Sequence, residues 1–260
     1  MDFLQAYVKS DPEVIAFGAT ELNSGYAQGL SPAALGAYLG WEGYSFDGDA
    51  IYARHGFKDP PSRVTIALGA CDGKTPMWAV YAKVFRTAEA AAANNDDYVN
   101  LVSTHFRHAD ASYACGGADS QGTILRNWLA AYASNGKPTV VIGDLNVIVE
   151  PAVDPRIQDY VRNGEYWYSG SLFPQHMTAW NLAGFMDAYR TICPDYRTQA
   201  GFTSTWHGGQ YYGAPWKRID YALVKGSTVM DTQLFNHVPE GSNPRNCMAS
   251  DHAGLVATMR

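Results

Sequence analysis

The stretch Val140-Val141-Ile142-Gly143-Asp144-Leu145-Asn146 places polar side chains directly after a run of apolar ones. Such an apolar run is typical of a strand that is buried on both faces of a sheet. Asp144 and Asn146 are two residues apart, so on extended backbone their side chains lie on one face. A carboxylate and an amide that converge at a strand end suit a phosphate oxygen, an attacking water or a hard cation. The same spacing also occurs in turns that have no catalytic role.

The composition favours a loop-rich protein with strands and a large core. The chain has 260 residues, of which 47% are hydrophobic and 17% charged, and it contains 25 glycines and 13 prolines. This balance argues against a helical bundle and supplies enough apolar side chains for a sizeable core. The net charge of −6 implies no broad attraction to nucleic acid, although it is compatible with a local basic groove.

The cysteines and the N-terminus leave the cellular compartment unassigned. The four cysteines are widely spaced and none belongs to a Cys-x-x-Cys pair, which argues against a zinc site. They fit either two disulfides or four buried thiols. Residues 1–4 lack the features of a signal peptide, so we expect secretion only if the natural chain begins further upstream. No apolar run is long enough for a membrane-spanning helix.

The apolar patterns along the chain predict two sheets with helices outside them. Strands are expected at residues 14–17, 44–46, 50–54, 64–68, 77–85, 98–105, 140–143, 202–206, 219–224 and 252–259. Helices are expected at residues 3–8, from 31 onward, at 123–132 and at 176–182. Residues 89–97 are expected to form a solvated hairpin or loop, and residues 151–174 a long loop.

Polar side chains recur at the ends of the predicted strands. They are Glu21, His105, Asp144 with Asn146, Asp220, and Asp251 with His252. Each has a structural explanation of its own, since Glu21 can cap a loop and Asp220 can pair with Arg218. Together they supply what phosphoester hydrolysis needs: carboxylates for a divalent metal, a histidine to activate water, an acid to orient that histidine, and donors around the phosphorus.

The order and spacing of these residues resemble the endonuclease/exonuclease/phosphatase superfamily, which includes deoxyribonuclease I, apurinic endonucleases and neutral sphingomyelinases. The resemblance is carried by Thr104-His105, Gly143-Asp144-Leu145-Asn146, Arg218-Ile219-Asp220-Tyr221 and Ser250-Asp251-His252, in that order, and by Glu21 after an apolar strand. It spans nearly the whole chain. It implies a single domain over residues 1–260 with an α/β (α+β) fold, a four-layer sandwich in which two mostly antiparallel β-sheets pack face to face with helices outside.

The resemblance also implies how a metal and a water molecule would be held. Glu21 and Asp251 would bind Mg²⁺, with Mn²⁺ as the alternative. His252 would act as general base or acid on the attacking water, and Asp220 would hold the tautomer of that histidine.

The remaining candidates would act on the phosphate. By resemblance, Asp144 and Asn146 would position the water and a phosphate oxygen, while His105 would donate to the phosphate and stabilise charge in the transition state. Two features of the family have no match here. The family begins with a strand that carries a metal-binding asparagine, so we expect that this strand is missing or that Asn23 or another group substitutes. Its phosphate-contacting arginine is also unmatched, because Pro76-Met77-Trp78 stands at that place.

We therefore expect a divalent-metal-dependent hydrolase of phosphoester bonds, in the first place a phosphodiesterase or nuclease-like enzyme acting as a monomer. The alternatives are a phosphomonoesterase or sphingomyelinase-type enzyme on a lipid or inositol head group, and an inactive binding domain of the same fold. The substrate would be a nucleic acid, a nucleotide or a phospholipid or inositol head group. Aromatic residues of two long loops suit stacking on bases or contact with lipid, and also ordinary packing: Tyr166, Trp167, Tyr168, Tyr211, Tyr212 and Trp216.

Overall fold

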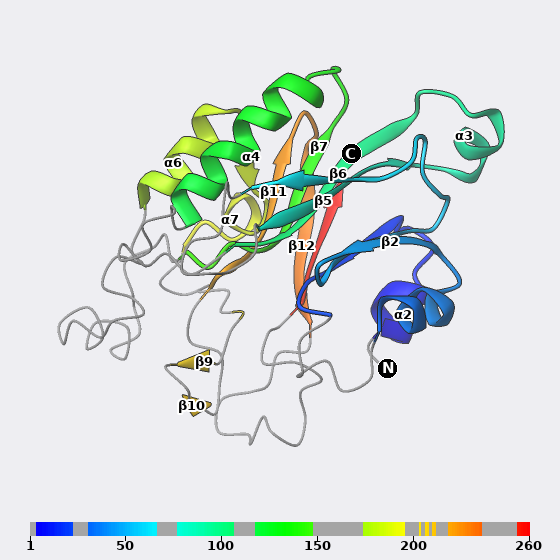
Figure 1. The fold of residues 1–260 in the computed structure, drawn as a ribbon, viewed down its shortest axis with the longest axis horizontal. Helices are drawn as coiled ribbons and strands as arrows, with labels where there is room; N and C mark the ends of the chain where they lie inside the picture. Colours follow the sequence, from blue (N-terminus) through cyan, green and yellow to red (C-terminus); the bar gives the residue numbers. More distant parts are fainter. Residues whose placement is uncertain are drawn as a thin grey trace.

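The structure is a computed structural model. The residues described are 4–22, 31–66, 77–106, 118–147, 174–195, 203, 206–207, 210–211, 218–235 and 254–260. In this part of the chain, strands build two layers that face each other, and helices lie on the outer side of each layer (Figure 1). No helix among these residues is long and apolar enough to cross a membrane.

The larger sheet has six strands in the order β4-β5-β6-β7-β11-β8. Their bounds are β4 (Ser62–Thr65), β5 (Trp78–Phe85), β6 (Tyr98–His105), β7 (Thr139–Asp144), β11 (Asp220–Lys225) and β8 (Met186–Asp187). Strands β6 and β7 run parallel, and all other neighbours in this sheet run antiparallel. Because parallel neighbours need a crossover connection, the chain between β6 and β7 passes through helix α4 (Ala118–Tyr132).

The second layer consists of a three-stranded sheet and a pair of strands. The sheet has the order β1-β3-β2, with β1 (Ala16–Ala19), β2 (Glu42–Phe46) and β3 (Asp49–Ala53). The pair is β12 (Val229–Phe235) with β13 (Gly254–Met259). Side chains from both layers form one core, which includes Ile51, Val80, Leu101, Val140, Ala222 and Val229. A separate short pair is formed by β9 (Trp206–His207) and β10 (Gln210–Tyr211).

Helices cover the outer side of each layer. On the larger sheet, α4 and α6 (Pro174–Leu182) bury a core that includes Val102, Leu125, Leu129, Trp180 and Tyr221. On the smaller sheet, the π-helix η1 (Gln5–Lys9) and α2 (Pro32–Leu39) bury Val8, Leu35 and Tyr52. Alternate residues of one strand thus face different cores, as Leu101 and Val102 of β6 do. The predicted four-layer sandwich is confirmed.

The predicted loop at residues 89–97 is wrong, because helix α3 (Ala88–Ala93) lies there. The hydroxyl of Thr87 caps this helix by accepting a hydrogen bond from the Ala90 N–H at 3.0 Å. Its alanines have the highest helix propensity, and Asn94 ends it in the left-handed conformation with φ 47°. The acids and amides that suggested a loop belong to its solvated side and to the turn that follows.

The predicted strand at 202–206 also needs correction. Thr203 lies outside any strand, and β9 begins at Trp206. The hydroxyl of Thr203 accepts hydrogen bonds from the backbone N–H groups of Ile219 and Asp220, each at 3.2 Å. This residue therefore fixes the start of β11 instead of extending a sheet. Strands β8, β10 and β12 and helix α7 (Ala188–Ile192) were not predicted, since short or alternating polar segments give weak periodic signals.

Gly143 permits the close approach of β7 to β6. Its φ is 136°, and a Cβ atom there would lie 1.9 Å from the carbonyl oxygen of Thr104, its partner in the parallel register. Only glycine adopts this backbone without strain, and any side chain would push apart the two central strands.

We expect Gly143→Ala to lower the free energy of unfolding by at least about 3 kcal/mol, because strain and a backbone clash act together. Gly136→Ala is a matched control, since its φ is 75° and no atom lies within 4 Å of its Cβ position. Strain alone should cost that variant about 1–2 kcal/mol. Urea unfolding of both variants measures the difference, and equal losses would contradict the role assigned to Gly143.

Candidate active site

His105, Asp144 and Asp220 form a row across three neighbouring strands. The register of β6 and β7 pairs His105 with Asp144, and the register of β7 and β11 pairs Asp144 with Asp220. Residues in register lie on the same face of a sheet. This face is turned toward the second layer, because Leu101, Val140 and Ala222, which lie an even number of residues away, belong to the core between the layers.

The imidazole of His105 lies between two carboxylates and an amide. Its Nδ1 is 3.6 Å from Oε1 of Glu21, and its Nε2 is 3.8 Å from Oδ2 of Asp144. Nδ2 of Asn146 is 3.0 Å from the same Nε2 and also donates to the carbonyl oxygen of Phe106 at 2.7 Å. Because the amide nitrogen can only donate, Nε2 accepts and the ring proton of the neutral histidine lies on Nδ1, toward Glu21.

Two of these residues have a backbone conformation that favours glycine. Glu21 has φ 59° and Asn146 has φ 51°. The N–H of Asn146 donates to Oδ1 of Asp144 at 2.7 Å, and the N–H of Leu22 donates to the carbonyl oxygen of Gly48 at 3.0 Å. These hydrogen bonds hold the strained turns in place, so that both side chains point toward His105. Strain of this kind is often found where side chains are held for a function.

The start of β11, and with it Asp220, is held by buried polar contacts. Nη1 of Arg218 donates to Oδ2 of Asp187 at 2.7 Å, and both side chains are buried. The hydroxyl of Tyr221 donates to the carbonyl oxygen of Val147 at 2.9 Å. Because buried ion pairs are costly to break, these contacts fix the position of the strand end.

Asp49 is a buried acid that the sequence analysis missed. It is 5% exposed, and its Oδ2 accepts a hydrogen bond from the backbone N–H of His105 at 3.2 Å. Burial raises the pKa of the Asp49 carboxyl well above its usual range; the His105 N–H opposes this shift, and the nearby charges of Asp47, Glu21 and Asp144 add to it. The available signal in the sequence was an acid at the first position of an otherwise apolar strand.

The remaining predicted residues are not described. Asp251, His252 and Asn23 lie outside the described residues, as do five of the six loop aromatic residues; of Tyr211 only the backbone, in β10, is described. Strand β13 begins at Gly254, shortly after His252. The described residues thus bring together Glu21, His105, Asp144 and Asn146, with Asp220 beside Asp144.

The donor atoms around His105 fit a hard divalent cation. Among the described residues, no group of three or more His, Cys, Asp or Glu side chains is close enough to enclose a metal ion. The carboxylates of Glu21, Asp49 and Asp144 nevertheless lie near enough to one another to raise the pKa of Asp49 by mutual repulsion. Carboxylate oxygens are the ligands that Mg²⁺ prefers, and a cation would relieve this repulsion. The described residues thus supply donor atoms of the right kind for such an ion, but not a complete set of ligands.

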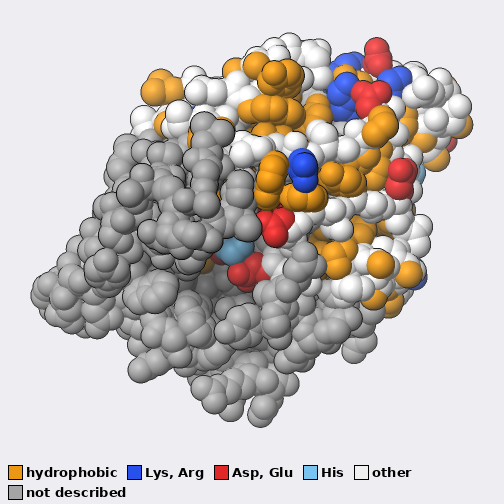
Figure 2. Space-filling view, in the orientation of Figure 1, with side chains coloured by type: hydrophobic (Ala, Val, Ile, Leu, Met, Phe, Trp, Pro, Cys, Tyr) orange, Lys and Arg blue, Asp and Glu red, His pale blue; other side chains and the backbone are white. Residues whose placement is uncertain are grey.

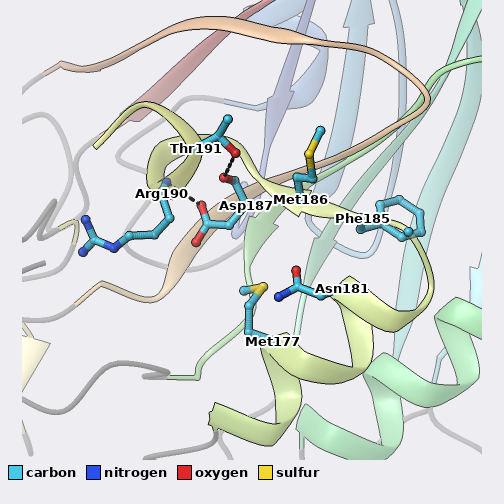
Figure 3. A pocket seen from close by; sticks show the side chains of 8 residues that line it. Met177, Asn181, Phe185, Met186, Asp187, Arg190 and Thr191 are labelled. Atoms are coloured by element: carbon cyan, nitrogen blue, oxygen red, sulfur yellow. Dashed lines mark hydrogen bonds between the residues drawn. The ribbon is translucent and has the colours of Figure 1, made fainter. Parts of the chain in front are cut away.

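A separate pocket lies between α6, β8 and α7 (Figure 3). Its lining includes Met177, Asn181, Phe185 and Asp187 but none of the candidate residues. Oδ1 of Asp187 accepts from the first N–H groups of α7, and Oδ2 binds Arg218, so this carboxylate serves the fold. We assign this pocket no part in the chemistry of the site.

A comparison with family models identifies the family of the chain. The chain belongs to the Endonuclease/Exonuclease/phosphatase family, whose model matches residues 1–252. Members of this family are hydrolases of phosphoester bonds, and this chain is accordingly a phosphoester hydrolase of that superfamily.

Solved structures of the family share the fold. An AP endonuclease from Archaeoglobus fulgidus is 17% identical, with a TM-score of 0.61, covering 99% of this chain and 91% of the other. The 3′ phosphatase NExo from Neisseria, bound to a product DNA hairpin, is 16% identical, with a TM-score of 0.58, covering 100% and 92%. The human Nocturnin catalytic domain with bound sulfate is 15% identical, with a TM-score of 0.56, covering 99% and 84%. A search of curated proteins gave no match.

We expect Asp49→Asn to stabilise the protein at neutral pH in buffer that contains EDTA. An unfolded aspartate loses its proton near pH 3.9, whereas folded Asp49 keeps it to a higher pH, so stability falls as pH rises through that window. The neutral amide of the variant can still accept a hydrogen bond from the His105 N–H, and it avoids this loss of stability. The stability that Asp49→Asn gains over the parent protein should be absent near pH 3.5 and should grow as the pH rises. Each 1 kcal/mol gained corresponds to about 2–4 °C in Tm.

The exposed Asp96, whose side chain is 76% accessible, provides the control. Asp96→Asn should show no comparable gain between pH 3.5 and pH 8. If the difference in melting temperature between Asp49→Asn and the parent protein stays constant over this pH range, the raised pKa does not belong to Asp49. Thermal unfolding followed by circular dichroism at several pH values provides the measurement.

Proposed function

We propose that this chain is a divalent-metal-dependent phosphodiesterase or nuclease-like hydrolase. The observation that carries the proposal is the row of His105, Asp144 and Asp220 on one face of the sheet, with Glu21 and Asn146 turned toward the histidine. A phosphoester hydrolase needs carboxylates, an amide and an imidazole to position and activate water at a phosphate, and these side chains lie together at the ends of neighbouring strands.

Glu21 and Asp251 would hold the cation, Mg²⁺ with Mn²⁺ as the alternative. When bound, the cation supplies positive charge against the negative charge of the phosphate. Asp49 is near enough to Glu21 and Asp144 for their negative charges to raise its pKa, so a cation bound there would favour its ionised form. The carboxylates of Glu21 and Asp144 favour a cation over a neutral or anionic occupant at this place.

The water would be activated by His252, with Asp220 orienting its ring. His252 would accept a proton from the water as the water oxygen attacks the phosphorus. The bond between the phosphorus and the leaving oxygen breaks, and the leaving oxygen takes a proton from solvent. Asp144 and Asn146 would position the water and a phosphate oxygen. His105 would place its ring against the phosphate, where the imidazole stabilises the charge that develops in the transition state.

We expect the protein to hydrolyse bis-p-nitrophenyl phosphate with Mg²⁺ or Mn²⁺, and to lose this activity in EDTA. Asp220→Asn and His252→Ala should each lower kcat by about 10²–10⁴-fold, because the water would lose its base or the orientation of that base. The exposed Asp231 on β12 provides a matched control, and Asp231→Asn should keep the parent activity. Release of p-nitrophenol measures the activity of the parent protein and of the three variants.

Other outcomes would identify a different function. Hydrolysis of sphingomyelin or of an inositol phosphate, with the diester left intact, would replace this proposal with a head-group hydrolase. A folded protein that turns over none of these substrates with any divalent metal would be a binding domain of the same fold. Full activity of Asp220→Asn would remove that residue from the proposed chemistry.

A further inference from the structure

Arg63 is an exposed arginine that is stacked on two aromatic rings. Its Cζ lies 4.4 Å from the ring centroid of Phe46 and 4.6 Å from that of Trp78. The two rings contact each other edge to face, with centroids 5.3 Å apart and planes at 78°. The three residues come from β4, β2 and β5, so both layers of the sandwich contribute to this cluster, which we call the Arg63 cluster.

The strand registers place the Arg63 cluster beside the candidate site. Ala79 of β5 pairs with Thr104 of β6, so the adjacent residues Trp78 and His105 lie at the same strand ends and on the same face. Trp78 therefore extends the row of His105, Asp144 and Asp220 to a fourth strand. Arg63 is in register with Val80, two residues along β5 from Trp78 and on the same face. With strands about 4.8 Å apart and a rise of about 3.4 Å per residue, its Cα lies roughly 12 Å from that of His105.

Contacts of the second layer also place the Arg63 cluster beside the candidate site. Phe46 pairs with Asp49 across the turn between β2 and β3, and Asp49 binds the backbone of His105. Figure 2 shows one face of the molecule, on which basic, acidic and histidine side chains lie among hydrophobic ones. The aromatic rings are only partly buried, which leaves ring surface accessible at this rim.

The positive charge of Arg63 is not neutralised within the described part of the chain. There its guanidinium contacts the two rings and forms no ion pair and no hydrogen bond, whereas Arg86 pairs with Asp97 and Arg218 with Asp187. Stacking occupies the face of a guanidinium and leaves its N–H donors at the edge. Because the rings hold the side chain in place, it is preorganised to bind a phosphate with two parallel hydrogen bonds.

We propose that Arg63 binds a second phosphate of the substrate, next to the one that is hydrolysed, and that the substrate class is single-stranded nucleic acid. The inference rests on the proposed phosphodiesterase function. A nucleic-acid strand repeats its phosphates at short intervals and carries bases that stack on exposed rings. A sphingomyelin head group has no second phosphate, and an inositol polyphosphate has further phosphates but no base to stack on the rings. The exposed large hydrophobic residues of the described chain, Tyr132, Leu182, Met186 and Met230, belong to other elements and build no membrane-binding surface at this rim.

Binding of a fluorescein-labelled oligothymidylate in EDTA, measured by fluorescence anisotropy, tests this proposal without turnover. Arg63→Gln should weaken binding about tenfold at low salt, which corresponds to the loss of a charge-assisted contact. It should also reduce the slope of log affinity against log salt by about 0.7, the contribution of one phosphate in a single strand. Arg63→Lys should show a smaller loss, because it keeps the charge but not the paired donors.

Arg86→Gln is the matched control, since Arg86 follows the far end of β5 and pairs with Asp97 at 3.3 Å. It should bind the oligonucleotide as the parent protein does. Equal affinity and equal salt slope for Arg63→Gln and Arg86→Gln, with unchanged melting temperatures, would overturn the proposal. Absence of oligonucleotide binding by the parent protein at low salt would overturn it too. Turnover of bis-p-nitrophenyl phosphate is scored separately, so failure of the proposed function and failure of this inference are distinguishable.

Discussion

The registry between β6, β7 and β11 is the constraint on which the candidate site depends. A shift of one residue in a strand turns every side chain to the opposite face. With such a shift, Asp144 would leave the row that it forms with His105 and Asp220 and would point into the helix-covered core. The close contact of Gly143 with Thr104 and the buried pair of Arg218 with Asp187 oppose this movement from the two sides of β7.

The site concentrates negative charge where the fold would be more stable without it. Asp49 is buried, and Glu21 and Asp144 raise its pKa further, while Glu21 and Asn146 adopt left-handed backbone. The surrounding sandwich has a large apolar core on each side of the main sheet, which can offset such local costs. Charge and strain that the fold does not need are typical of places kept for a ligand.

Local sequence patterns predicted most elements and part of the site. Strand β6 and helices α2, α4 and α6 lie where apolar spacing and capping residues indicated, because such periodicity is encoded by neighbouring residues. Helix α3 was missed because its acids and amides resembled a loop, although its alanines and Thr87 cap favour a helix. Asp49 was missed because no neighbouring residue in the chain indicates that its carboxylate accepts a hydrogen bond from the backbone N–H of His105.

The sequence by itself determined which residues end the strands and which superfamily the chain resembles, since both depend on short motifs and their order. Only the tertiary structure decided which strand ends are neighbours, that Asp49 contacts the backbone of His105, and that Arg63 stacks on Phe46 and Trp78. The physical reason is that these contacts join residues from different strands and both sheets. Their proximity arises from register and layer packing, which no local stretch of the chain encodes.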